Sequence, residues 1–174
     1  MEEEKGLRYS GSVVLGMSDA LIELTGALAG LTFALQDLNL VALAGLVTGI
    51  AAAFSMGASE YLSSKAENKV ESPINAAFHT WISYLVTVLL LISPYLVLSS
   101  DSPEYMGLEP HVLALLCTFV IGLLIVAMFN YYVSTVEEVS FRSRFLEMAG
   151  ILGVVSLISY GIGIILRGVL GVDV

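Results

Sequence analysis

The chain has 174 residues, of which 57% are hydrophobic and only 13% are charged, and its mean hydropathy is +0.88. A water-soluble domain of this length does not need so much apolar side chain, so the composition predicts an integral membrane protein. The formal net charge of −9 disfavours nucleic acid and anionic lipid head groups as principal partners, because both would be repelled. A cation matches this negative charge better than either of these anionic partners does.

Five apolar segments are each long enough to cross about 30 Å of hydrocarbon, which takes about 20 helical residues. They lie near residues 12–35, 39–64, 76–99, 111–135 and 146–169. Polar or turn-forming residues separate them, and no connection is long enough for a second domain. The sequence therefore predicts an all-α integral membrane protein in which residues 1–174 form a single five-helix transmembrane domain.

The basic residues predict how these helices are oriented. In a five-span arrangement only Arg167 falls near one side, and the other basic residues fall on the opposite side. Those residues are Lys5, Arg8, Lys65, Lys69, Arg142 and Arg144. Because basic residues collect on the cytoplasmic side, we expect the N-terminus inside and the C-terminus outside. An odd number of spans disfavours two matched halves within one chain, so we expect any two-fold symmetry to come from a second copy.

Two carboxylates, Asp19 and Glu23, interrupt the first apolar segment one helical turn apart. Placing either of them in lipid costs about 3 kcal/mol or more, so both are predicted to face a protein interior, a cavity or an ion. The alternative is that one of them is protonated, or is hydrogen-bonded to a neighbouring hydroxyl such as Ser18 or Thr25.

The second apolar segment carries a sulfur ligand and a carboxylate, Met56 and Glu60, one turn apart. Small residues recur beside them at every fourth position: Gly45, Gly49, Ala53 and Gly57. Such a stripe lets a neighbouring helix approach closely, so it predicts a packing seam. Met56 and Glu60 lie next to this seam.

The two segments can be compared by the depth at which their polar residues lie in the membrane. Counted from the cytoplasmic boundary at about 1.5 Å per residue, Asp19 and Met56 each lie roughly 14 Å deep. We therefore expect them to meet at one level, with Glu60 about a turn nearer the cytoplasm and Glu23 about a turn further out. Carboxylates suit hard divalent cations, and a thioether shifts the preference toward transition metals such as ferrous iron or manganese. The alternative for Met56 is a purely packing role.

Further acids flank the cytoplasmic ends of the predicted helices. These are Glu67 and Glu71 after the second helix and Glu137 and Glu138 after the fourth. They could collect metal ions at the inner mouth, or they could form a solvated face paired with nearby lysine and arginine residues. His79 and His111 lie at the starts of the third and fourth helices. A position at the membrane–water interface explains the presence of both histidines. The sequence has no phosphate-binding glycine loop, no paired-cysteine site and no helix with histidines around a glutamate, so we expect neither an enzyme nor a resident cofactor.

Three runs of residues resemble the vacuolar iron transporter family, also called the Ccc-type iron and manganese transporters. They are GMSDAL at residues 16–21, AFSMGASEYLSSKAE at residues 53–67 and, more loosely, ISYGIG at residues 158–163. The resemblance implies a homodimer of five-helix subunits with the path between subunits along the first two helices. It also implies that ferrous iron or manganese leaves the cytoplasm, in exchange for protons in the plant members, and that Asp19 and Met56 line the path.

The chain also departs from this family at several points. Plant members carry a long metal-binding insertion after the second helix, and here only a short connection follows Glu67. Leu24 stands where the family usually has a proline, Thr48 where plant members have a glutamate, and Arg8 where they have an acid. Because these acids and the insertion are absent, the resemblance gives weaker support to proton exchange than to metal transport.

Together these features predict a homodimeric multi-pass transporter of Fe²⁺ or Mn²⁺, acting in the cell membrane of a prokaryote. Its expected ligands are Asp19, Met56, Glu60 and Glu23, and its expected partners are the metal ion, the bilayer and a second copy. The alternative is a membrane metal sensor or helical scaffold that binds cations without transporting them.

Overall fold

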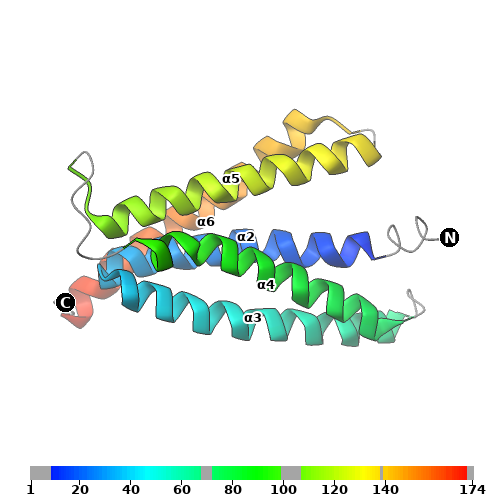
Figure 1. Cartoon of the computed structure of the whole chain (residues 1–174), viewed down its shortest axis with the longest axis horizontal. Helices are drawn as coiled ribbons and strands as arrows, with labels where there is room; N and C mark the ends of the chain where they lie inside the picture. Colours follow the sequence, from blue (N-terminus) through cyan, green and yellow to red (C-terminus); the bar gives the residue numbers. More distant parts are fainter. Residues whose placement is uncertain (1–8, 68–71, 99–106, 138, 172–174) are drawn as a thin grey trace. The chain divides into compact units, whose positions relative to one another are not determined.

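The computed structural model describes residues 9–67, 72–98, 107–137 and 139–171. These residues form five α-helices, shown in chain order in Figure 1. The helices are α2 (Ser10–Leu35), α3 (Leu38–Glu67), α4 (Pro73–Val97), α5 (Pro110–Glu137) and α6 (Phe141–Leu170). Each is long and apolar enough to cross a membrane, which confirms the predicted number of spans and indicates a multi-pass membrane protein.

The helices differ from the predicted segments mainly at their polar ends. α3 continues to Glu67, so Lys65 lies in its last turn, and α6 begins at Phe141 rather than near residue 146. A helix satisfies its own backbone hydrogen bonds, so it continues past the apolar residues that mark the hydrocarbon. α4 begins at Pro73, a residue suited to a first helical turn, and ends at Val97, slightly before the predicted boundary.

Contacts between residues divide the chain into two units. The first contains Met1–Leu21 and Leu46–Leu90, and therefore the start of α2 and most of α3 and α4. In α2, a Cβ atom at Gly16 would collide with the Thr80 carbonyl oxygen and the Ser83 hydroxyl of α4, so only glycine permits this approach. The Thr80 hydroxyl donates a hydrogen bond of 3.0 Å to the carbonyl of Ser12. These contacts join α2 to α4.

The predicted seam of α3 packs against α4 in this unit. A Cβ atom at Gly49 would lie 2.6 Å from a methyl carbon of Val88, and one at Gly57 would lie 3.1 Å from Cβ of Trp81. Ala53, between these two glycines, is fully buried. The seam is therefore confirmed as a helix-packing surface.

The second unit contains Ile22–Gly45 and Leu91–Val174. At its α2–α3 turn, the Asp37 carboxylate accepts a hydrogen bond of 2.8 Å from the Leu40 N–H and so caps α3. The hydroxyls of Thr32 and Tyr95 form a buried hydrogen bond of 2.6 Å, and the Thr118 hydroxyl donates to the Leu91 carbonyl at 2.8 Å. These bonds tie α2 to α4 and α5 to α4.

The glycines of α6 have two different environments. A Cβ atom at Gly163 would collide with the Gly30 carbonyl of α2, and one at Gly30 would lie 2.8 Å from the Ser159 carbonyl, so close packing explains both. By contrast, a Cβ atom at Gly150, Gly161 or Gly168 would meet nothing within 4 Å among the described residues. Helix packing within the described part of one chain therefore does not explain glycine at these positions.

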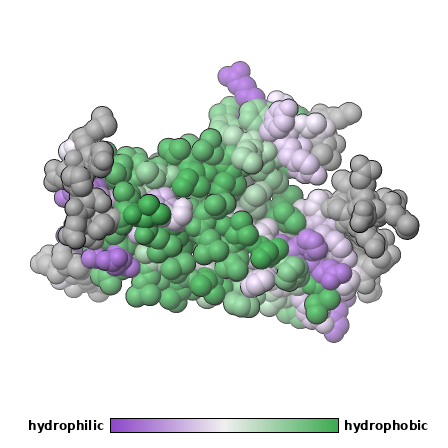
Figure 2. Space-filling model, viewed as in Figure 1, coloured by the Kyte–Doolittle hydropathy of each residue, from purple (hydrophilic) through white to green (hydrophobic). Residues whose placement is uncertain are grey.

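Hydrophobic side chains cover most of the surface seen in Figure 2. Large apolar residues are exposed on all five helices, for example Leu43 (61% exposed) on α3 and Val169 (76% exposed) on α6. Water would disfavour such a surface, whereas lipid chains accept it.

Candidate metal site

Three of the four predicted ligands belong to the first unit. Asp19 on α2 and Met56 and Glu60 on α3 are all half-buried. Glu23 belongs to the second unit and is exposed, although it lies on the same continuous helix one turn beyond Asp19. Residues four apart lie on one face of a helix, so α2 carries both carboxylates on one face.

The Glu60 carboxylate is held by two hydroxyl groups. Its Oε1 atom accepts a hydrogen bond of 2.8 Å from Ser12 of α2 and one of 3.2 Å from Ser64 on the next turn of α3. Among the described residues no hydrogen bond reaches Oε2, and no lysine, arginine or histidine forms an ion pair with Glu60. The carboxylate is thus oriented by hydroxyl groups from both α2 and α3.

The bond between Ser12 and Glu60 also sets the antiparallel register of α2 and α3. Asp19 lies about 10 Å further along α2 from Ser12, at 1.5 Å per residue. The same distance along α3 from Glu60 reaches the level of Ala53, so Met56 lies about 4–5 Å short of the level of Asp19. The register therefore orders the levels as Glu60, Met56 and Asp19. That Asp19 and Met56 bind one ion stays a prediction.

The two hydroxyls named as possible partners of the α2 carboxylates, Ser18 and Thr25, have other surroundings. Ser18 donates its hydroxyl to the carbonyl of Val14, one turn earlier in the same helix. The Thr25 hydroxyl is buried and has no hydrogen-bond partner among the described residues. These contacts do not include a hydrogen bond from Ser18 or Thr25 to Asp19 or Glu23, and the alternative in which one carboxylate is protonated stays a prediction.

The predicted metal-collecting acids fall at the edges of the described structure. Glu67 and Glu137 are the last residues of α3 and α5, and their side chains lie outside the described part. Glu71 and Glu138 lie outside the described residues altogether. Within the described part, no three histidine, cysteine, aspartate or glutamate residues gather closely enough to hold a metal ion.

Both histidines have local partners. The His79 ring stacks on Tyr9 with centroids 4.9 Å apart, and its Nδ1 lies 2.7 Å from the Asn75 carbonyl. Nε2 of His111 lies 3.1 Å from a carboxylate oxygen of Glu109. These contacts agree with structural positions at helix starts.

Comparison with known protein families gives a match over the two helices that carry the candidate ligands. Residues 11–72 match the VIT family model. The match supports membership of the vacuolar iron transporter family. It covers nearly all of α2, the whole of α3, and all four predicted ligands. No protein of the curated set matches the chain. A match to this family suggests membrane metal-ion transport.

Sequence reasoning missed the two serines that hold Glu60. Ser64 could have been found, because a serine four residues after a glutamate on a helix lies within reach of its carboxylate. Ser12 gave no such signal, because its contact with Glu60 joins two helices and depends on their register.

Proposed function

We propose that this protein transports a divalent transition metal, Fe²⁺ or Mn²⁺, out of the cytoplasm as a homodimer, with the path between subunits along α2 and α3. The observation that supports this most is the VIT family match over residues 11–72, because it falls on the two helices that carry every candidate ligand. The hydrogen bond between Ser12 and Glu60 fixes these helices to one another at one end.

Each ligand has a distinct role in this proposal. Glu60 is the inner station, Asp19 and Met56 form the central site, and Glu23 is a deeper carboxylate that binds either the metal or a proton. A carboxylate must lose its proton to bind metal, so a group that alternates between the two would couple metal export to proton entry. The carboxylate and thioether set favours Fe²⁺ or Mn²⁺ over Ca²⁺ and Mg²⁺.

Two features of a single chain support the proposed dimer. Glu23 is exposed on a helix long enough to span the membrane, where contact with lipid is costly. The described part of one chain also gathers no group of three acidic, histidine or cysteine ligands. In a two-fold symmetric dimer the same surface meets its copy, so α2 facing α2 would cover Glu23 and double the number of ligands.

Metal uptake by purified protein in liposomes tests the proposal. We expect Fe²⁺ and Mn²⁺ to enter, and Asp19→Asn and Met56→Ala each to lower the initial rate about tenfold or more while the protein stays folded and dimeric. Leu62→Ala is the control, because Leu62 is 65% exposed on the same helix and is not a candidate ligand. If the Asp19→Asn protein transports at the normal rate, the assignment of Asp19 to the central site is wrong. If the wild type binds metal without transporting it, the sensor or scaffold alternative is correct.

An imposed pH gradient tests the coupling separately. We expect metal uptake to accelerate when protons can flow in the opposite direction, and the lumenal pH to change as metal enters. Equal rates with and without the gradient, with no change in lumenal pH, would leave metal transport standing and remove proton exchange.

A further inference from the structure

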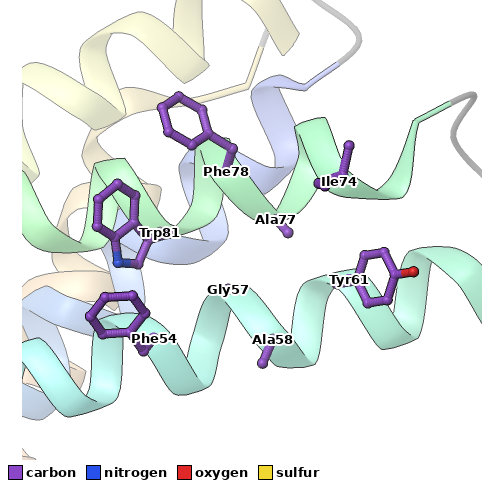
Figure 3. Close-up of a pocket in the computed structure, with 8 residues that line it drawn as sticks. All are labelled: Phe54, Gly57, Ala58, Tyr61, Ile74, Ala77, Phe78 and Trp81. Carbon is purple, nitrogen blue, oxygen red and sulfur yellow. The ribbon is translucent and has the colours of Figure 1, made fainter.

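An apolar groove runs along the surface of the first unit between α3 and α4, and its α3 residues lie next to Met56 and Glu60 in the sequence. It has a volume of about 500 Å³, within the range of about 300–1,000 Å³ typical of small-molecule sites. Its lining, drawn in Figure 3, consists of Phe54, Gly57, Ala58, Tyr61, Ile74, Ala77, Phe78 and Trp81. The only polar side-chain atoms in this set are the Tyr61 hydroxyl and the Trp81 ring nitrogen.

Small residues form the part of the groove where the two helices approach, and large residues form its sides. Gly57 of α3 lies opposite Ala77 of α4 in Figure 3, with Trp81 and Phe54 at one end of the groove and Tyr61 at the other. The Trp81 ring centroid lies 5.6 Å from that of Phe54 and 5.8 Å from that of Phe78. Phe54 and Phe78 are 61% and 56% exposed, so the groove is open to the surroundings of the helices.

A positive charge lies at the Tyr61 end of the groove. The Lys65 ammonium is 5.7 Å from the centre of the Tyr61 ring, and no described carboxylate forms an ion pair with it. Lys65 lies in the last turn of α3, where a lysine can extend its charged group from the apolar zone toward a polar head-group layer. Tyrosine and tryptophan are also typical of that layer.

We propose that this groove binds an acyl chain of an anionic phospholipid, whose phosphate pairs with Lys65. The groove lies on two helices long enough to span a membrane, so its surroundings are lipid rather than water. An apolar chain fits its lining, and a phosphate complements the lysine at its end. The net charge of −9 repels anionic lipids from the chain as a whole, so among the described residues Lys65 is the source of a preference for them here.

Trp81 is the only tryptophan of the chain, so its fluorescence reports directly on the groove. The experiment reconstitutes the full chain in vesicles of phosphatidylcholine and phosphatidylglycerol in which one of the two lipids carries brominated acyl chains, because bromine quenches tryptophan on contact. At equal mole fractions we expect brominated phosphatidylglycerol to quench Trp81 at least twofold more strongly than brominated phosphatidylcholine.

Two variants test the residues that carry the proposal. Lys65→Gln should abolish the difference between the two lipids, because it removes the charge at the end of the groove. Ala58→Phe should reduce quenching by both lipids at least twofold, because Ala58 is exposed in the lining and a larger side chain fills the space. Leu62→Phe is the matched control, since Leu62 is exposed on the same helix outside the lining, and it should leave quenching unchanged.

Three outcomes would overturn the proposal. Equal quenching by the two lipids in the wild type would mean that Trp81 meets only unselected surrounding lipid. Unchanged quenching in Ala58→Phe would mean that the chain does not enter the groove. No quenching by either lipid would mean that protein, such as a second copy, covers the groove. None of these results depends on metal transport, so the transport proposal succeeds or fails separately.

Discussion

At the scale of single residues, Glu60 has the best-defined surroundings of the four candidate ligands. Two hydroxyls, from Ser12 and Ser64, hold the same carboxylate oxygen at 2.8 and 3.2 Å. Groups that orient a metal ligand in this way commonly affect metal affinity about 10- to 100-fold when they are removed. The serines are thus expected to matter for metal binding although neither needs to touch the ion.

Removing the Ser12 hydroxyl tests this role. We expect Ser12→Ala to weaken Mn²⁺ binding about tenfold, measured by calorimetry on the purified protein, because Glu60 loses its only described hydrogen bond from α2. Ser63→Ala is the control, since Ser63 is exposed beside Ser64 on α3. Similar affinities for the two variants would show that Glu60 either is not a ligand or does not need Ser12.

At the scale of helices, the packing depends on a few glycines. We expect Gly16→Ala to lower the free energy of unfolding by about 1–3 kcal/mol, because the added methyl group would collide with the Thr80 carbonyl and the Ser83 hydroxyl. Gly161→Ala should be neutral or stabilising by up to about 1 kcal/mol, because alanine favours helix and nothing described lies within 4 Å of the new Cβ.

Denaturant unfolding of both variants in one detergent measures this difference. Circular dichroism can follow the loss of helix, and the wild type provides the reference. Equal stability of the two variants would show that α2 and α4 adjust to the added methyl group. A loss of stability for Gly161→Ala would instead indicate a contact with a second copy, because one described chain has nothing at that position.

The sequence predicted helices better than it predicted their contacts. Runs of apolar residues locate all five helices, and the small-residue stripe of α3 predicts its packing against α4. The same reasoning does not extend to Gly150, Gly161 and Gly168, because a small residue marks where close packing is permitted and does not show that a neighbour is present. The contact of Ser12 with Glu60 and the offset between Met56 and Asp19 both depend on interhelix register, which composition and periodicity do not encode.

At the scale of the whole molecule, the distribution of basic residues predicts a cytoplasmic N-terminus. We expect a membrane-impermeant maleimide added to intact cells to label Glu109→Cys and not Arg142→Cys, in a Cys117→Ser background that removes the natural thiol. Both positions are exposed, one just before α5 and the other in the first turn of α6. Labelling of Arg142→Cys alone would show that the orientation is opposite to the predicted one. The predicted direction of metal transport would then also be reversed.

The hydroxyl partners of Glu60 also have an electrical consequence. A hydroxyl orients a carboxylate without cancelling its charge, and no described basic residue cancels it either. A deprotonated Glu60 with no ion bound therefore carries an uncompensated negative charge among the described residues. A membrane voltage acts on a mobile charge by about 2.3 kcal/mol per 100 mV for a full crossing, and on a shallow group by a share of that. In the proposed transport cycle, the step in which the unloaded protein resets should thus respond to voltage differently from the step that carries metal.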